Sequence, residues 1–247
     1  MTGEFIRVDG RKPNEIRAIN MTPFYLEYAE GSVLIECGKT RILCAATVEN
    51  KIPPHLKDTG QGWVTAEYAL LPRSTQQRSM RDGVRGHING RSYEIQRLIG
   101  RALRTVVDRQ KLGERTIILD CDVIQADGGT RTTAITGAFV AMALACDQLL
   151  KDGKIGKIPI KDYIGAVSVG IVEGNPVVDL CYIEDAQADV DMNIVMTGSG
   201  DFVEIQGTGE NTPFSYKSMI DMIDLARQGI NQMIELQKKI VDIPLLK

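Results

Sequence analysis

The chain has 247 residues, of which 43% are hydrophobic and 25% charged, the ordinary composition of a soluble globular protein. No apolar run approaches ~20 residues, and the N-terminus lacks the apolar core of a signal peptide, so we expect no membrane association and a cytoplasmic location. Five widely spaced cysteines without a CxxC pair argue against a disulfide framework or a zinc site.

The net charge of −3 hides a strong asymmetry along the chain. Residues 51–110 hold 11 Lys or Arg and only 5 Asp or Glu, whereas residues 162–216 hold 10 acids and no Lys or Arg. Within residues 73–104 all eight cations are arginines, whose planar guanidinium suits bidentate phosphate contacts. This separation indicates a basic surface for a polyanion and a separate acidic site, although an ordinary solvated face would also explain the arginines.

Hydrophobic periodicity and turn signals predict the order of the elements. Strands are predicted as a pair within 31–49, around a Gly-Lys turn, and then over 62–71, 115–127, 163–171, 176–182, 189–197 and 202–208. Helices are predicted over 92–108, 131–151 and 215–241, and a polar Arg-rich loop over 72–90. The order lacks strict alternation, so it favours an α+β fold, with mixed β-sheets backed by α-helices in two intertwined halves. No linker divides the halves, and we expect one domain over 1–247.

A glycine-rich junction lies where a predicted strand leads into a helix. The sequence ADGGTRTTAITG (126–137) places two glycines there, followed by Thr130 and Arg131. A helix N-terminus offers unpaired N–H groups, and glycines let an anion come close. An arginine in the first turn opposes the helix dipole, so a bound anion would explain it; a tight turn with a surface arginine would explain it equally well.

A second segment, IEDAQADVDMN (183–193), gathers carboxylates with no Lys or Arg among them. Asp185 falls in a predicted turn, while Asp189 and Asp191 begin the next strand with alternate residues on one face. Three such carboxylates would suit a magnesium ion, which prefers oxygen ligands. A solvated acidic turn is the simpler alternative from this segment alone.

Taken together, five long segments resemble the bacterial ribonuclease PH family in the expected order over nearly the whole chain. They read RVDGRKPNEIR (7–17), GWVTAEYALLPRSTQQR (62–78), GRSYEIQRLIGRALR (90–104), DVIQADGGTRTTAITGAF (122–139) and VDMNIVMTGSGDFVEIQGTGE (190–210). No segment corresponds to the extra domains of the related polynucleotide phosphorylase.

The resemblance implies a phosphate-dependent 3′→5′ exoribonuclease, or tRNA nucleotidyltransferase, that trims the 3′ ends of tRNA precursors and other RNA. Inorganic phosphate, the co-substrate, would attack the last phosphodiester and release a nucleoside 5′-diphosphate, reversibly. The family pattern also implies a homohexameric ring, a trimer of dimers.

The resemblance also implies roles for particular residues. Phosphate would be held by Arg91, Gly129, Thr130 and Arg131. Asp185 and Asp191 would form the catalytic pair and, with Asp189 as a third candidate ligand, would hold Mg²⁺ or Mn²⁺. The candidate RNA-binding residues are Arg73, Arg78 and Arg81 of the loop, together with Arg97 and Arg101 of the following helix.

Two other functions fit part of the sequence. A catalytically silent ring subunit would share the fold but would not need the phosphate arginines and the acids, both of which are present here. A plain RNA-binding module would explain the arginines but not the acidic segment.

Overall fold

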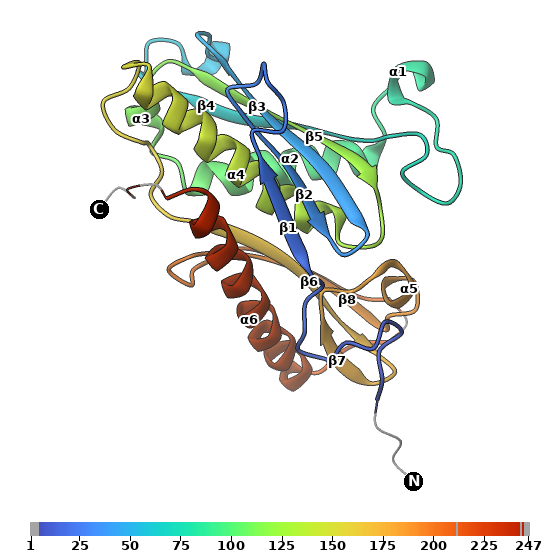
Figure 1. Ribbon diagram of the computed structural model, residues 1–247. Coiled ribbons are helices and arrows are strands. Elements are labelled where there is room, and N and C mark those ends of the chain that lie inside the picture. Colours follow the sequence, from blue (N-terminus) through green and yellow to red (C-terminus); the bar gives the residue numbers. More distant parts are fainter. Residues whose placement is uncertain (1–4, 211, 243, 245–247) are drawn as a thin grey trace.

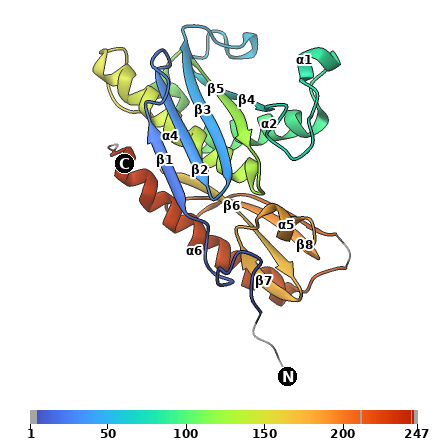
Figure 2. The same ribbon diagram turned by 45° about the vertical axis from the view of Figure 1, so that its right-hand side comes forward.

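The computed structural model describes residues 5–210, 212–242 and 244. Two β-sheets lie in separate halves of the molecule, and helices pack between and beside them (Figure 1). The N-terminal segment starts beside the second half and then crosses into the first strand of the other half, so the two halves are intertwined as expected (Figure 2).

The first sheet has five strands and carries the first half of the chain. All neighbours are antiparallel except the last pair, which is parallel. The order across the sheet is β1 (Ile19–Pro23), β2 (Gly31–Cys37), β3 (Thr40–Glu49), β5 (Thr116–Gln125) and β4 (Trp63–Leu70).

The second sheet has four antiparallel strands from the C-terminal half. Their order is β7 (Asn175–Val178), β6 (Ile164–Val172), β8 (Val190–Thr197) and β9 (Phe202–Gly209). The strand predicted over 176–182 ends at Val178, because Asp179 takes a positive φ of 55° and the chain then turns into a short helix.

The three predicted helices are present as α2 (Gly90–Thr105), α4 (Thr130–Lys151) and α6 (Tyr216–Ile240). The periodicity did not predict the one-turn helices α1 (Asp82–Arg85), α3 (Arg109–Leu112) and α5 (Tyr182–Asp185), the 3-10 turn Pro54–Leu56, or strand β1. One turn of helix is too short to show a hydrophobic period.

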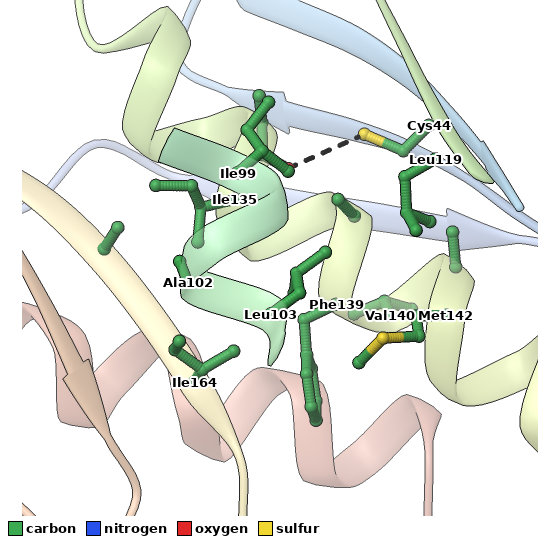
Figure 3. Close-up of a cluster of buried hydrophobic side chains, with 14 of the residues drawn as sticks. Cys44, Ile99, Ala102, Leu103, Leu119, Ile135, Phe139, Val140, Met142 and Ile164 are labelled. Atoms are coloured by element: carbon green, nitrogen blue, oxygen red, sulfur yellow. Dashed lines mark hydrogen bonds between the residues drawn. The ribbon is translucent and has the colours of Figure 1, made fainter. Parts of the chain in front are cut away.

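Helix α4 is the centre of the hydrophobic core. It packs on β2 and β3 of the first sheet and on β6 of the second. Figure 3 shows Phe139, Val140 and Met142 of this helix among side chains from α2 and both sheets. The helix is long and apolar enough to cross a membrane, but 83% of its apolar window is buried inside the protein, so these properties are those of a core helix.

Small residues allow this close packing. A Cβ atom on Gly137 would lie only 2.7 Å from Cγ2 of Ile35 and 2.9 Å from Sγ of Cys44. A larger residue there would push the helix off the sheet, at a typical cost of about 1–3 kcal/mol. The five cysteines are free and buried in the core.

The N-terminal segment is fixed to the second half by the buried guanidinium of Arg7. Its Nε and Nη2 donate to the two carboxylate oxygens of Glu184 at 2.7 and 2.6 Å. Nη1 donates to the carbonyl of Val178 at 2.8 Å, and Nη2 also reaches that of Asp179 at 3.0 Å. Burial opposes ionisation of Glu184, but Arg7 outweighs it and holds the pKa of this carboxyl below its usual value.

Arg17 makes a second buried contact of the same kind. Asp179 accepts hydrogen bonds from the backbone N, Nε and Nη2 of Arg17 at 2.7, 2.9 and 2.6 Å. Although burial raises the pKa of Asp179, Arg17 lowers it further than burial raises it. Both ion pairs therefore tie residues 7–17 to the end of β7 and to α5.

The pair Arg7–Glu184 predicts a large stability loss on removal of one partner. Glu184→Gln would leave the guanidinium buried without its counter-charge, and we expect a loss of about 3–5 kcal/mol in the free energy of unfolding, measured by urea titration. The pKa values of Glu184 and of Asp179, the partner of Arg17, are both lowered in the folded protein. The stabilisation by these ion pairs is therefore present above about pH 4 and is lost as the pH falls further.

Glu235→Gln is the matched control, because Glu235 forms an exposed ion pair with Lys238 at 2.7 Å. Such surface pairs contribute about 0–1 kcal/mol. A Glu184→Gln variant as stable as this control would contradict the importance given to the buried pair.

Candidate active site

The glycine turn that precedes α4 has the geometry of an anion site. Gly128 and Gly129 have φ angles of 78° and 64°, and Gly129 is the N-cap residue of α4. In the described part of the chain no side chain caps this end of the helix, so the first N–H groups are available to a ligand. Beneath them the hydroxyl of Tyr68 lies 2.8 Å from Oγ1 of Thr130 and fixes this side chain from inside the core.

The same turn lies directly against the segment that carries the acids. A Cβ atom on Gly128 would approach the carbonyl oxygen of Leu180 to 2.5 Å and the backbone nitrogen of Tyr182 to 2.8 Å. Glycine is therefore required both by the positive φ and by this backbone contact. As a result, the start of α5 is held beside the start of α4.

The acidic segment separates into two classes that the sequence did not distinguish. Glu184 is buried in the ion pair with Arg7, whereas Asp185, next to it, is at the end of α5 with an exposed side chain. Although the residue is exposed as a whole, the surrounding protein partly shields its carboxyl group from water and so raises the pKa of Asp185, and the nearby charges of Arg91 and Arg131 only partly offset this effect. Glu184 therefore has a structural role, whereas Asp185 interacts electrostatically with Arg91 and Arg131.

Asp191 is the more perturbed of the two candidate catalytic acids. Burial, followed by the charge of Asp185, raises its pKa to about 6, and Arg131 acts in the opposite direction. Its Oδ1 atom is buried and has no hydrogen-bond partner among the residues that the structure describes, while Nδ2 of Asn193 donates to Oδ2 at 3.4 Å. Such an unpaired carboxylate oxygen beside a second carboxylate is suited to a cation ligand.

Arg131 projects from the first turn of α4 and is contacted by two other elements. Its Nη1 donates to Oε1 of Gln206 on β9 at 2.7 Å and lies 3.7 Å from Oε1 of Glu94 on α2. Gln206 in turn donates to Glu94 at 3.1 Å. The positive charge of Arg91, near the start of α2, acts to lower the pKa values of Asp185 and Tyr68, and the charge of Arg131 does the same. The structure therefore brings both predicted phosphate arginines to the predicted catalytic acids.

The third predicted ligand, Asp189, does not join this pair. Among the residues that the structure describes, no three His, Cys, Asp or Glu side chains gather to hold a metal ion. Strand β8 begins at Val190, and Asp189 lies in a bend directly before it. The three carboxylates are therefore not grouped in this structure, and the role of Asp189 as a metal ligand stays a prediction.

The five predicted RNA-binding arginines fall into two separate groups. Arg73, Arg78 and Arg81 are exposed on the loop that carries α1 and extends away from the body in both ribbon views (Figures 1 and 2). Arg97 and Arg101 are exposed on α2. They line a cavity of about 400 Å³ together with Trp63, Tyr93 and Arg104.

Neighbouring side chains already engage part of this second group. Arg101 pairs with Glu204 on β9, and the guanidinium of Arg97 lies 5.9 Å from the centre of the Tyr93 ring. Arg104 lies over the ring of Trp63 at 4.3 Å. An RNA phosphate at Arg101 would have to compete with Glu204.

Several residues of the site were not identified from the sequence. Tyr68 contacts Thr130, and Gln206 and Glu94 contact Arg131, both predicted phosphate-binding residues. The negative charge of Glu210 adds to the repulsion that raises the pKa values of Asp185 and Asp191. Each comes from a different strand, helix or loop, and no local pattern marks it. Only contacts between distant segments reveal these residues.

Comparisons with known proteins match most of the chain to one enzyme family. Residues 15–146 match the model of the 3′ exoribonuclease family, domain 1, and residues 162–229 match that of domain 2. Ribonuclease PH of Bacillus cereus is 58% identical over 235 residues, which cover 95% of this chain and 96% of the relative. Ribonuclease PH of Bacillus anthracis is similar to the same extent.

Solved structures show the same fold at lower sequence identity. Rice Rrp46 superposes with a TM-score of 0.76 at 19% identity and covers 95% of this chain and 100% of its own. A chain of the Archaeoglobus fulgidus exosome with RNA bound to the active site gives 0.79 at 21%, covering 94% of this chain and 92% of its own. The predicted α+β fold is confirmed, and the chain belongs to the ribonuclease PH family of 3′ exoribonucleases.

Proposed function

We propose that this protein is a phosphorolytic 3′→5′ exoribonuclease that trims the 3′ ends of tRNA precursors and releases nucleoside 5′-diphosphates. One observation carries the proposal: the free N-terminus of α4, with Arg131, lies beside the close carboxylate pair of Asp185 and Asp191. Phosphorolysis needs both features, because the nucleophile and the scissile group are anions and repel each other.

The cationic side of the site would bind the attacking phosphate. Arg91 and Arg131 provide planar, permanently charged donors, and the N–H groups at Gly129 and Thr130 provide neutral ones. Held there, a phosphate oxygen attacks the phosphorus of the last phosphodiester. The bond to the 3′ oxygen of the preceding nucleotide breaks, and this oxygen takes up a proton as the shortened RNA leaves. In reverse, the 3′ hydroxyl attacks a nucleoside diphosphate and phosphate departs.

The acidic side fits a divalent cation, which we propose to be Mg²⁺ or Mn²⁺. Asp185 and Asp191 would hold it, since two nearby carboxylates resist ionisation unless a cation compensates them. When bound, such an ion supplies positive charge to the transferring phosphoryl group. Asp189 remains only an outer candidate, because it is not grouped with the pair. We propose Asp185 and Asp191 as the catalytic residues.

We further propose that RNA reaches this site along the exposed arginines of the loop, Arg73, Arg78 and Arg81, and of α2, Arg97 and Arg101. Contacts of this kind position a nucleic acid without reading its sequence. We also propose a cytoplasmic homohexamer, a trimer of dimers, with 1–247 as one catalytic unit. Exposed apolar side chains on a monomer support assembly, and here they include Tyr25, Tyr28 and Phe202.

The direct experiment compares RNA degradation with and without inorganic phosphate. With a tRNA carrying extra 3′ nucleotides, Mg²⁺ and phosphate, we expect stepwise shortening and nucleoside 5′-diphosphates as the released product, identified by chromatography. Without phosphate the RNA should remain intact. Release of nucleoside monophosphates would identify hydrolysis instead, and binding without any release would favour a silent subunit or a binding module.

Asp191→Asn is predicted to separate activity from stability. Because the pKa of Asp191 is raised to about 6 in the fold, its contribution to stability is present at low pH and is lost as the pH rises through about 4 to 6. In EDTA at pH 7.5, the variant should therefore be more stable than the native protein by roughly 1–3 kcal/mol in urea unfolding, while phosphorolysis falls by about 10²-fold or more.

Asp189→Asn is the matched comparison for the metal. Added Mg²⁺ should stabilise the native protein and the Asp189→Asn variant alike, and should stabilise the Asp191→Asn variant much less. If Asp191→Asn were less stable than the native protein in EDTA, or gained as much from Mg²⁺, the assignment of Asp191 to the cation site would be wrong.

A further inference from the structure

We propose that Thr40 and Arg17 are positioning residues, which hold the turn at Gly128 and Gly129 so that the N-terminus of α4 meets inorganic phosphate in the productive orientation. Neither side chain belongs to the predicted phosphate set. The inference rests on the proposed function, because it takes the phosphate to bind at this turn.

Thr40 contacts the turn with a single buried hydroxyl at the start of β3. Its Oγ1 accepts a hydrogen bond from the backbone N–H of Asp127 at 2.9 Å and donates to the carbonyl of Gly128 at 2.8 Å. The residue is fully buried and pairs with Cys37 in the β2–β3 ladder. Strand β3 therefore holds backbone groups of two successive residues, Asp127 and Gly128, just before the helix.

Arg17 fixes the same two residues from the other side. Its Nη1 donates to the carbonyl of Asp127 at 2.5 Å, and its Nη2 lies 3.5 Å from the carbonyl of Gly128. Two hydrogen bonds from the guanidinium to the Asp179 carboxylate, from Nε and Nη2, hold it in place, and the backbone N of Arg17 donates a third. Asp179 stands just before Cys181, the N-cap of α5, so Arg17 connects the turn to the helix that carries Asp185.

The turn needs contacts from other elements because its own residues do little to restrict its conformation. Two successive glycines at positive φ are conformationally free, and no side chain caps Gly129. A small rotation of this turn would redirect the first N–H groups of α4 and shift Arg131 relative to Asp185. Donors stabilise a transition state only when they are already oriented, so a loosened turn should weaken phosphate use specifically.

Thr40→Val tests this role with little change of shape, since it removes both hydrogen bonds and keeps the branched side chain. We expect the KM for inorganic phosphate to rise roughly three- to tenfold, as expected for the loss of hydrogen bonds of ordinary strength. The KM for RNA should stay within about twofold, since the predicted RNA-binding arginines lie on other elements. Thr40→Ser retains the hydroxyl and should restore the native phosphate KM.

A second readout does not depend on turnover. Inorganic phosphate should raise the midpoint of thermal unfolding of the native protein, and Thr40→Val should need a correspondingly higher phosphate concentration for the same shift. Thr116→Val is the matched control, because Thr116 is also buried, and its hydroxyl donates one hydrogen bond, to the carbonyl of Lys51 at 2.6 Å. This control should lose stability but keep the native phosphate KM.

Arg17→Lys provides an independent variant should Thr40→Val fail to fold. It keeps a positive charge for Asp179 but loses the forked contact to the turn carbonyls, and it should raise the phosphate KM in the same direction. A phosphate KM unchanged in whichever of these two variants folds would overturn the proposal, as would equal increases in the KM for phosphate and for RNA.

Arg131→Ala separates this inference from the proposed function. If Arg131→Ala raises the phosphate KM but Thr40→Val behaves like Thr116→Val, the positioning role is wrong and the phosphate site stands. If Arg131→Ala also leaves the phosphate KM unchanged, phosphate does not bind at this turn, and both assignments fail.

Discussion

A guanidinium buried away from water must find acceptors for its N–H groups and a counter-charge, and Arg7 and Arg17 find both in the other half of the protein. This requirement fixes the path of the N-terminal segment and the conformation of the chain at Asp179. It also sets the position of α5, through Glu184. Since Arg17 reaches the turn before α4 as well, the same contacts bring the two sides of the active site together.

The acids near α5 then take two different roles. Arginines hold the pKa values of Asp179 and Glu184 low, and these residues stabilise the fold. Burial raises the pKa values of Asp185 and Asp191, and mutual repulsion raises that of Asp191 further. Titratable groups whose environments push their pKa values apart commonly mark a reaction site. The repulsion between these two carboxylates therefore lowers the stability of the protein, and a bound cation would compensate it.

The sequence predicted the main strands and helices, because each is long enough to show its hydrophobic period. It also predicted that Arg91, Arg131, Asp185 and Asp191 belong to one site, mostly through motifs of the family. It did not separate Glu184 from the other acids, since the partner Arg7 is 177 positions away. Nor did it show that Asp189 is not grouped with the other two carboxylates, because the start of β8 at Val190 depends on pairing with β6 and β9. Thr40 and Arg17 carry no local signal of their contacts with the turn.

We propose that phosphate and the divalent cation bind side by side, between the N-terminus of α4 and the two aspartates. The most direct measurement is the paramagnetic relaxation of the phosphorus NMR signal of inorganic phosphate by Mn²⁺ in the presence of the protein. We predict strong relaxation, beyond that of Mn²⁺ and phosphate alone, in the native protein, and its loss in both Arg131→Ala and Asp191→Asn. Phosphate that binds the native protein without any relaxation by bound Mn²⁺ would contradict the account.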